Sequence, residues 1–386
     1  MLKLGGKVIK IEAEKNQPNL LLSISTNKKL PSILKESKAF LVSDSIPEGF
    51  LHYLILESQK HLIKGVPNGA NFTILSDEYS YLGDGDVIRL SPNQGSIKVL
   101  FRRSAPHNSF LVTEQCNHYC LMCSQPPKNV DDSWLIEELT KVIPLLPKDA
   151  SEICFTGGEP TLYGDTFLDL LSLTKSYVPR AAIHILSNGR RFKDIEFAKR
   201  YAAIKHEDMM VGIPIYSDDP SLHDYIVQAD GAFEETIQGV LNLKKLNQKV
   251  EIRVVLHKQS IPRLKQLCEF IGRNLLFVDH VALMGLEMTG FTRANLDKLW
   301  IDPLDYKDLL SEAVNILTRY GMKVSVYNHQ LCLINPDIHP NYRKSISDWK
   351  NEYATECESC KKQFECGGFF SSGIQNGYSK HLKPFV

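Results

Sequence analysis

The sequence has no excess of charge of either sign, because its 45 lysines and arginines balance its 45 aspartates and glutamates. Broad electrostatic attraction to nucleic acid or to an anionic membrane is therefore not expected. The 386 residues contain no uninterrupted apolar run of membrane-spanning length, since the best candidate, residues 275–286, includes Asp279 and His280. Residues 1–10 alternate apolar and charged positions and lack the apolar core of a signal peptide. Without a spanning run or a signal peptide, the expected location is the cytoplasm. The sequence also has no internal repeat and no low-complexity stretch.

Nine cysteines are present, and an odd count argues against a fully paired disulfide framework. In a cytosolic chain, metal binding is the better interpretation of such cysteines. Cys154 and Cys268 lie within apolar strand and helix patterns, so both are expected in the buried core. The others gather in an early and a late group. These candidate metal ligands are Cys116, Cys120, Cys123, Cys332, Cys357, Cys360 and Cys366.

The early group has the spacing Cys-x3-Cys-x2-Cys and follows the apolar run 110–112. This predicts a strand that ends in a loop whose three thiols converge. Three thiolates can hold three irons of a four-iron–four-sulfur cluster, which leaves the fourth iron open to a small molecule. A structural zinc site would need four closed ligands, so a zinc knuckle would have to borrow one from elsewhere. His118 lies inside the loop, and we expect it to point away from the thiols.

Two further motifs follow in order. The first is Gly157-Gly158-Glu159-Pro160, within residues 154–162, and the second is Ser187-Asn188-Gly189 at the end of residues 184–189. Together with the cysteine loop they resemble the radical S-adenosylmethionine (SAM) superfamily over roughly residues 109–290. One departure is Met122, because the residue before the last cysteine is often aromatic in that superfamily.

The resemblance implies a 4Fe-4S cluster on Cys116, Cys120 and Cys123, with SAM chelated to the open iron. An electron from the cluster would cleave SAM to methionine and a 5′-deoxyadenosyl radical. Related maturases often bind the SAM carboxylate with an arginine, which is Val227 here, so Arg253 could substitute if it faces the barrel interior. The implied cofactor-binding residues are Gly157, Gly158, Glu159, Pro160, Ser187, Asn188, Arg253 and Glu287.

Each of these residues also has an ordinary structural explanation. Gly157 to Pro160 would, alone, be an ordinary turn, and Asn188-Gly189 has its usual turn conformation as an equal alternative. An exposed or salt-bridged Arg253 is at least as common a situation for an arginine. No general acid or base can be named from the sequence.

The pattern of strands and helices predicts three domains. Residues 1–105 form an N-terminal β-rich or α+β domain, with one helix between Pro47 and Lys60. Residues 106–322 alternate strands and helices, which predicts a partial (β/α)6 TIM-like barrel whose chemistry sits at the carboxyl ends of the strands. Residues 323–386, where the regular pattern fades, form a small Cys-rich extension. The overall class is α/β.

Individual elements can be placed as well. The strands expected before the barrel are 8–13, 20–25, 39–42, 71–75, 86–90 and 97–102. The barrel strands expected are 109–115, 152–157, 181–187, 209–217, 249–257 and 277–287. The helices expected are 131–146, 165–177, 193–204, 231–247, 261–274 and 303–320. Asp131 or Asp132 can cap the first of these helices, and Asp230 the fourth.

The late group combines Cys332 with the compact spacing Cys357-x2-Cys360-x5-Cys366. It resembles the auxiliary-cluster extensions of peptide-modifying radical SAM enzymes and has thiolates for one fully ligated second 4Fe-4S cluster. Structural zinc is the alternative, because four thiolates also suit that ion.

A narrower resemblance rests on Cys120-Leu121-Met122-Cys123-Ser124-Gln125-Pro126-Pro127 with His107-Asn108 before it, on the run 366–372 and on the segment 85–88. These resemble the maturase family of the His-Xaa-Ser peptide system. The resemblance implies an oxidoreductase-type enzyme that cross-links or oxidises a ribosomally made precursor peptide. The implied partners are a sister radical SAM maturase and an electron donor such as a flavodoxin or ferredoxin. Two alternatives remain: a radical SAM enzyme acting on a small molecule such as a nucleotide or cofactor precursor, and a non-catalytic zinc-binding scaffold.

Overall fold

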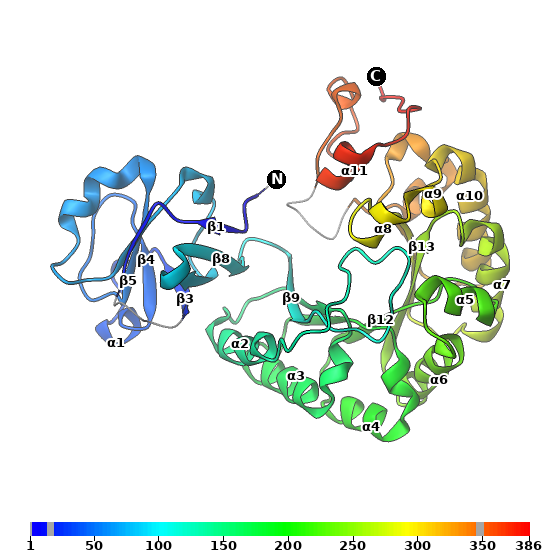
Figure 1. Ribbon diagram of the computed structural model, residues 1–386, viewed down its shortest axis with the longest axis horizontal. Coiled ribbons are helices and arrows are strands. Elements are labelled where there is room, and N and C mark those ends of the chain that lie inside the picture. The colour runs from blue at the N-terminus through cyan, green and yellow to red at the C-terminus, as the bar shows by residue number, and fades with distance from the viewer. Residues whose placement is uncertain (1, 14–18, 345–350) are drawn as a thin grey trace.

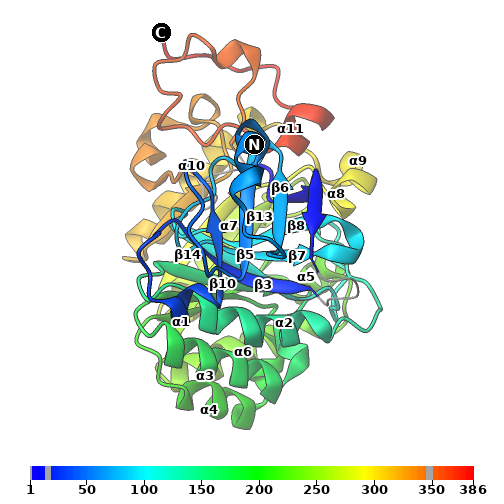
Figure 2. The same ribbon diagram turned by 90° about the vertical axis from the view of Figure 1, so that its left-hand side faces the viewer.

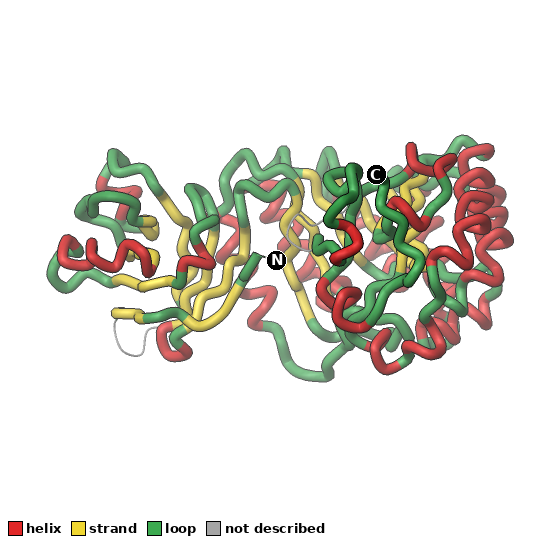
Figure 3. Tube along the Cα trace, turned by 90° about the horizontal axis from the view of Figure 1, so that it is seen from above, coloured by secondary structure: helices red, strands yellow, loops and turns green. Residues whose placement is uncertain are grey.

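The computed structural model describes residues 2–13, 19–344 and 351–386 and contains two β-sheets. The N-terminal sheet and a curved parallel sheet lie side by side along the long axis of the molecule (Figures 1 and 3). The C-terminal tail lies beside α8 to α10, at the far end of the parallel sheet (Figure 1). In the described part of the chain, no helix is both long and apolar enough to cross a membrane.

The N-terminal sheet has eight strands in the order β1-β8-β7-β3-β4-β5-β6-β2 and faces the viewer in Figure 2. The β-rich N-terminal part is therefore confirmed. Its strands are β1 (Gly5–Lys7), β2 (Lys10–Glu12), β3 (Leu20–Ser25), β4 (Lys38–Leu41), β5 (His52–Leu56), β6 (Phe72–Leu75), β7 (Val87–Ser91) and β8 (Ser96–Phe101). A short helix, α1 (Ser32–Lys35), connects β3 to β4.

The helix predicted between Pro47 and Lys60 is wrong. The segment forms strand β5 and then the 3₁₀ helix of Glu57–Gly65. Strand β5 lies between the parallel strands β4 and β6, and four of its five residues are buried. A short run that is apolar on both faces has no helical or alternating period, so pattern alone cannot identify it as a strand.

The two ends of this sheet are joined by one stretch of chain. Strand β1 pairs with β8, and strand β2, only three residues later, pairs with β6 at the opposite edge. Between them the backbone N–H of Val8 donates to Gly95 O and that of Ile9 donates to Ile74 O, both at 2.9 Å. The sheet therefore curls on itself, so that one short stretch of chain supplies both of its edge strands.

The second, parallel sheet has seven strands in the order β15-β14-β13-β12-β11-β10-β9, with helices outside it (Figure 1). This confirms the α/β class and the partial TIM-like barrel. The strands are β9 (His107–Thr113), β10 (Glu152–Gly157), β11 (Ala182–Leu186), β12 (Met209–Pro214), β13 (Lys249–Leu256), β14 (His280–Gly285) and β15 (Val324–Tyr327). The helices are α2 (Trp134–Val142), α3 (Asp165–Tyr177), α4 (Ile195–Ala203), α5 (Pro220–Val227), α6 (Ala232–Lys245), α7 (Leu264–Asn274), α8 (Phe291–Ala294), α9 (Leu296–Leu299), α10 (Pro303–Arg319) and α11 (Ser371–Asn376).

The barrel is longer by one strand than the sequence pattern suggests. Strand β15 pairs in parallel with β14 and falls inside the segment where the regular pattern was expected to fade. It has four residues, too few to show a period by themselves.

Helix caps also differ from expectation. Asp230 does not cap α6, because the Asp224 carboxylate accepts from Gly231 N at 2.6 Å and from Phe233 N at 2.8 Å. Before α2, Asp131 accepts from Ser133 N, whereas Asp132 turns back to the end of β9. The Asp132 carboxylate accepts from the Thr113 hydroxyl at 3.0 Å.

One apolar core runs through the barrel and its outer helices and includes Val87 and Phe101 from the N-terminal sheet. Beside that junction Arg89 makes a bidentate ion pair with Glu138 of α2 at 2.7 and 3.0 Å. The Arg89 guanidinium also lies over the Trp134 ring, 5.4 Å from its centroid. The N-terminal sheet is thus packed firmly against the first helix of the barrel.

Candidate functional site

The cysteine loop leaves the end of β9 and is fastened by elements far from it in sequence. The backbone N–H of Tyr119 donates to Val227 O at 3.1 Å, and that of Leu121 donates to Ile226 O at 2.9 Å, both at the end of α5. On the other side Phe291 N, at the start of α8, donates to Cys123 O at 2.8 Å. The loop is therefore held at the carboxyl ends of the strands by two later parts of the barrel.

The loop thiols are free, partly buried and close enough to influence one another. Burial, with smaller contributions from the neighbouring Glu159 and Cys123, raises the pKa of Cys116 to about 12. Burial likewise raises the pKa of Cys120, with added repulsion from Cys123 and Cys116. No side-chain cation contributes to either shift, so three thiolates at this place need a metal centre to hold them deprotonated.

The expectation that His118 points away from the thiols is wrong. Its ring Nδ1 lies 4.0 Å from Cys120 Sγ, and its backbone N–H donates to Cys116 Sγ at 3.4 Å. Burial lowers the pKa of His118 to about 3, so the ring is neutral at ordinary pH. Its Nε2 is buried and has no hydrogen-bond partner in the described part of the chain.

The two glycines of the second motif allow close packing onto the cysteine loop. A Cβ on Gly157 would lie 2.4 Å from Thr113 O, and one on Gly158 would lie 2.1 Å from Gln115 O. The backbone N–H groups of Gly158 and Glu159 donate to these same two carbonyls at 2.8 Å. Any side chain at either position would push the end of β10 away from the loop.

Glu159 joins the end of β10 to the end of β11. Its carboxylate is 1% exposed and accepts from Thr161 N at 2.9 Å, from Ser187 Oγ at 2.8 Å and from Asn188 N at 2.6 Å. The Thr161 hydroxyl donates to it as well. Burial raises the pKa of Glu159, and these hydrogen bonds oppose that rise. The carboxylate is therefore saturated by the chain itself, and Pro160 begins the buried turn that follows it.

Asn188 carries the network onward to the cysteine loop. Its side-chain amide donates to Asn117 Oδ1 at 2.6 Å. Its backbone carbonyl oxygen accepts from the Thr236 hydroxyl at 3.0 Å. Arg190 Nη1 donates to Asn117 O at 3.3 Å. The structure thus brings the cysteine loop, the Gly157–Pro160 segment and Ser187–Asn188 into one site at the ends of β9, β10 and β11.

Arg253 and Glu287 lie apart from that network. Arg253 points into the barrel and pairs with Glu251 at 3.2 Å, so it is both interior and salt-bridged. A Cβ on Gly212 would lie 3.0 Å from Arg253 Cδ, which shows how tightly the interior is filled. Glu287 lines a different cavity, with Trp300 and Tyr378.

The late cysteines converge although 34 residues separate the first from the last in sequence. Cys332, Cys357, Cys360 and Cys366 line one small cavity. Burial raises the pKa of Cys357, and the three other cysteines raise it further. Of the described residues, no group of three or more His, Cys, Asp or Glu is arranged around the position of a single metal ion.

Residues 110–271 match the family model of the radical SAM superfamily. This segment is a radical SAM enzyme domain. It contains the cysteine loop, the Gly157–Pro160 motif and the Ser187–Asn188 turn. The superfamily implies a 4Fe-4S cluster and SAM as its cofactors.

Several solved structures are similar to the chain. SuiB of Streptococcus suis bound to S-adenosylmethionine is 17% identical over 64% of this chain and 55% of its own, with a TM-score of 0.48. Native anSMEcpe with bound AdoMet is 18% identical over 56% and 62%, with a TM-score of 0.45. Coproporphyrinogen III oxidase (HemN) from Escherichia coli is 16% identical over 56% and 53%, also at 0.45. The match spans a little over half the length of these structures.

The radical SAM domain also contains a buried aromatic residue that the sequence analysis did not single out. Tyr216, just beyond β12, is 7% exposed, and burial raises its pKa well above the usual value, as do Cys120 and Cys123. Its ring stacks on His223 with centroids 5.9 Å apart at 24°. The one available signal was its position directly after a barrel strand.

Proposed function

We propose that the chain is a radical SAM maturase that modifies a ribosomally made precursor peptide, by cross-linking or another oxidation. The observation that carries the proposal is spatial. The three-cysteine loop, a cavity and the small cavity lined by Cys332, Cys357, Cys360 and Cys366, here called the four-cysteine chamber, follow one another from the barrel mouth into the tail. The proposal keeps residues 1–105, 106–322 and 323–386 as domains.

Cys116, Cys120 and Cys123 would hold the catalytic cluster. When bound, the cluster and SAM supply a 5′-deoxyadenosyl radical that takes a hydrogen atom from the substrate. The chain's own contribution is position. Gly157 and Gly158 let β10 approach the loop, while Glu159 fixes the turn from which a SAM molecule would be held by backbone groups and by Ser187 and Asn188.

The tail would hold a second 4Fe-4S cluster on Cys332, Cys357, Cys360 and Cys366. Support comes from their shared cavity, which is walled by Tyr353, Leu382 and Phe385 besides the thiols. A closed set of four thiolates also suits structural zinc, and metal analysis separates the two.

A peptide substrate is favoured over a small molecule by the cavity between the two cysteine sites. It is partly open to solvent, so a side chain could enter while the rest of a peptide stays outside. More specifically, the substrate would be a precursor peptide with His-Xaa-Ser repeats. A sister radical SAM maturase would act with this protein, and a flavodoxin or ferredoxin would be the electron donor.

The test is production of 5′-deoxyadenosine by the anaerobically reconstituted, reduced protein with SAM and a candidate precursor peptide. We expect formation of 5′-deoxyadenosine together with a peptide whose mass is lowered by the loss of hydrogen. A protein that binds zinc alone, without iron, and yields no 5′-deoxyadenosine would overturn the proposal.

A further inference from the structure

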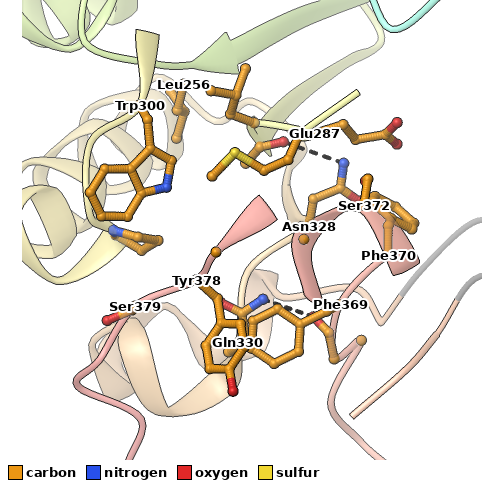
Figure 4. A pocket seen from close by; sticks show the side chains of 18 of the residues that line it. Leu256, Glu287, Trp300, Asn328, Gln330, Phe369, Phe370, Ser372, Tyr378 and Ser379 are labelled. Carbon is orange, nitrogen blue, oxygen red and sulfur yellow. Dashed lines mark hydrogen bonds between the residues drawn. The ribbon is translucent and has the colours of Figure 1, made fainter. Parts of the chain in front are cut away.

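A cavity lies between the barrel mouth and the tail, and the proposed function leaves open which side chain of a peptide it takes (Figure 4). One wall comes from the segment after β14 and from the stretch before α10, the floor from the end of β15, and the opposite wall from the tail. The residues that define these three sides are Glu287, Met288, Trp300, Asn328, Phe369 and Tyr378.

The segment that forms the first wall also touches the catalytic loop. A Cβ on Gly290 would lie 2.2 Å from Cys123 O, and Thr292 Oγ1 donates to Met122 O at 3.2 Å. On its other side the cavity shares Gln330 and Gly368 with the four-cysteine chamber. Gln330 Nε2 donates to Gly368 O at 2.8 Å. A group in this cavity would therefore sit between the two cysteine sites.

The lining is aromatic on two sides. Trp300 stands at one end in Figure 4, and Phe369 and Tyr378 lie below it with ring centroids 4.8 Å apart at 45°. Phe369 is 7% exposed, so its ring is fixed by packing. Rings held in this way present π-faces on which a flat group can stack.

The charge in the lining is an unpaired carboxylate. Glu287 makes no hydrogen bond or ion pair with any of the residues that the structure describes, and it lies at the end of the cavity opposite Trp300 (Figure 4). The cationic side chain in the described lining, Lys344, is directed into the tail, where its Nζ donates to Phe364 O at 3.0 Å. The floor amide of Asn328 is also occupied, donating to Gly285 O at 3.4 Å.

We propose that this cavity binds a planar cationic side chain of the substrate peptide, a guanidinium or an imidazolium. Trp300 and the tail aromatics offer faces on which the plane stacks, and the carboxylate of Glu287, at the other end of the cavity, attracts its positive charge. Aromatic faces attract cations, a planar cation can also stack on them, and a carboxylate nearby adds to the attraction. The inference deepens the proposed function and rests on it, because it names the side chain that a peptide substrate presents between the cysteine sites.

The probes are fluorescein-labelled Gly-Ser-Gly-X-Gly-Ser-Gly peptides in which X is Arg, His, Lys or Leu. Binding to the anaerobically reconstituted full-length protein is measured by fluorescence anisotropy. We expect the Arg peptide to bind about tenfold or more tightly than the Leu peptide, and more tightly than the Lys peptide. The His peptide should match the Arg peptide at about pH 5.5 and approach the Leu peptide at about pH 8, which distinguishes the two cations.

Two variants locate the preference. Glu287→Gln should remove the advantage of the Arg peptide over the Leu peptide, whereas Glu234→Gln, at an exposed position on α6, should retain it. Equal binding of all four peptides, no binding up to about 1 mM, or a preference that persists in Glu287→Gln would each overturn the inference.

The same preparation separates this inference from the proposed function. If the wild-type protein forms 5′-deoxyadenosine but shows no preference for a planar cation, the cavity assignment fails and the radical SAM assignment stands. If the preference is present but SAM is never cleaved, the cavity assignment stands as a binding site and the proposed function fails.

Discussion

The two cysteine sites of this molecule are built in opposite ways. The early loop has three cysteines and is fastened by distant parts of the barrel, at the ends of β10, β11 and α5 and the start of α8. The late group has four cysteines, and turns of the tail itself brace three of them. Tyr353 OH donates to Gln363 O and Cys366 O, and Gln363 Nε2 donates to Cys357 O at 3.3 Å.

This difference separates two tasks that the same thiol chemistry can perform. A site with three ligands placed by a rigid barrel leaves one coordination position for a reactant, and its geometry is set by the scaffold. A site with four ligands in the tail would be closed, so it would serve electron transfer or tail structure. Variants that damage one site and spare the other are therefore the direct test of the comparison.

The largest effect should come from the loop. Replacing Cys116, Cys120 and Cys123 by alanine should remove about four irons and lower SAM cleavage by about three orders of magnitude or more, because these thiols are the proposed ligands of the catalytic cluster. Iron analysis and chromatographic assay of 5′-deoxyadenosine measure both. Cys268→Ala, which changes a fully buried thiol of α7, should keep the iron. Retention of all iron by the triple variant would place the metal elsewhere.

The next effect should come from the tail. In the Cys357→Ala, Cys360→Ala double variant we expect iron to fall from about eight to about four per chain, with SAM cleavage in the absence of peptide retained. If the tail holds zinc instead, iron should stay at about four and one zinc should be lost. Loss of all iron from this variant would contradict the separation of the two sites.

A third effect should appear on acidification, in the barrel interior that supports the loop. Glu251 is buried, which alone would raise its pKa. The hydrogen bond from His280 at 2.6 Å and the charges of Arg253 and His184 nevertheless hold the pKa at about 2, below the usual 4.5. A carboxyl group whose pKa is lower in the folded than in the unfolded chain stabilises the fold at any pH above its unfolded pKa. The stabilisation is about 3 kcal/mol here, and it is lost as the pH falls from about 4.5 towards 2.

We therefore expect Glu251→Gln to unfold more easily than the wild type at neutral pH, with a difference that narrows as the pH falls through this range. Denaturant unfolding followed by circular dichroism gives the free energies. Glu358→Gln, at an exposed position in the tail, should differ from wild type by less than about 0.5 kcal/mol throughout. A Glu251→Gln difference that stays constant with pH would mean that the charge network does not stabilise the barrel.

Much of the barrel could be predicted from sequence because its elements are long and periodic. The predictions for 152–157 and 165–177 match β10 and α3 to the residue. Strand β5 was missed because it is apolar on both faces, and β15 because four residues are too few to show a period. Cys154 and Cys268 were rightly expected in the core.

The site was only partly predictable, for a physical reason. The cysteine spacing is local, so the ligands could be named, and the four tail thiols do share one cavity. Hydrogen-bond partners depend on the fold. The sequence therefore could not predict that the Glu159 carboxylate accepts hydrogen bonds from Thr161, Ser187 and Asn188. Likewise nothing in the sequence connects Trp300 with Tyr378 across the cavity.

The smallest effect should come from a single hydroxyl in the tail. Tyr353→Phe removes the hydroxyl that bonds to the backbone carbonyls of Gln363 and Cys366. These hydrogen bonds brace the turn between Cys360 and Cys366. The loss of one such hydrogen bond costs about 1 kcal/mol, so release of tail metal to a chelator should quicken roughly five-fold. Tyr81→Phe, whose hydroxyl donates to Lys3 O in the N-terminal sheet, is the matched control and should leave release unchanged. Because the tail is held by its own turns, Tyr353→Phe should not alter SAM cleavage without peptide; a parallel fall in that activity would show that the barrel and the tail support one another.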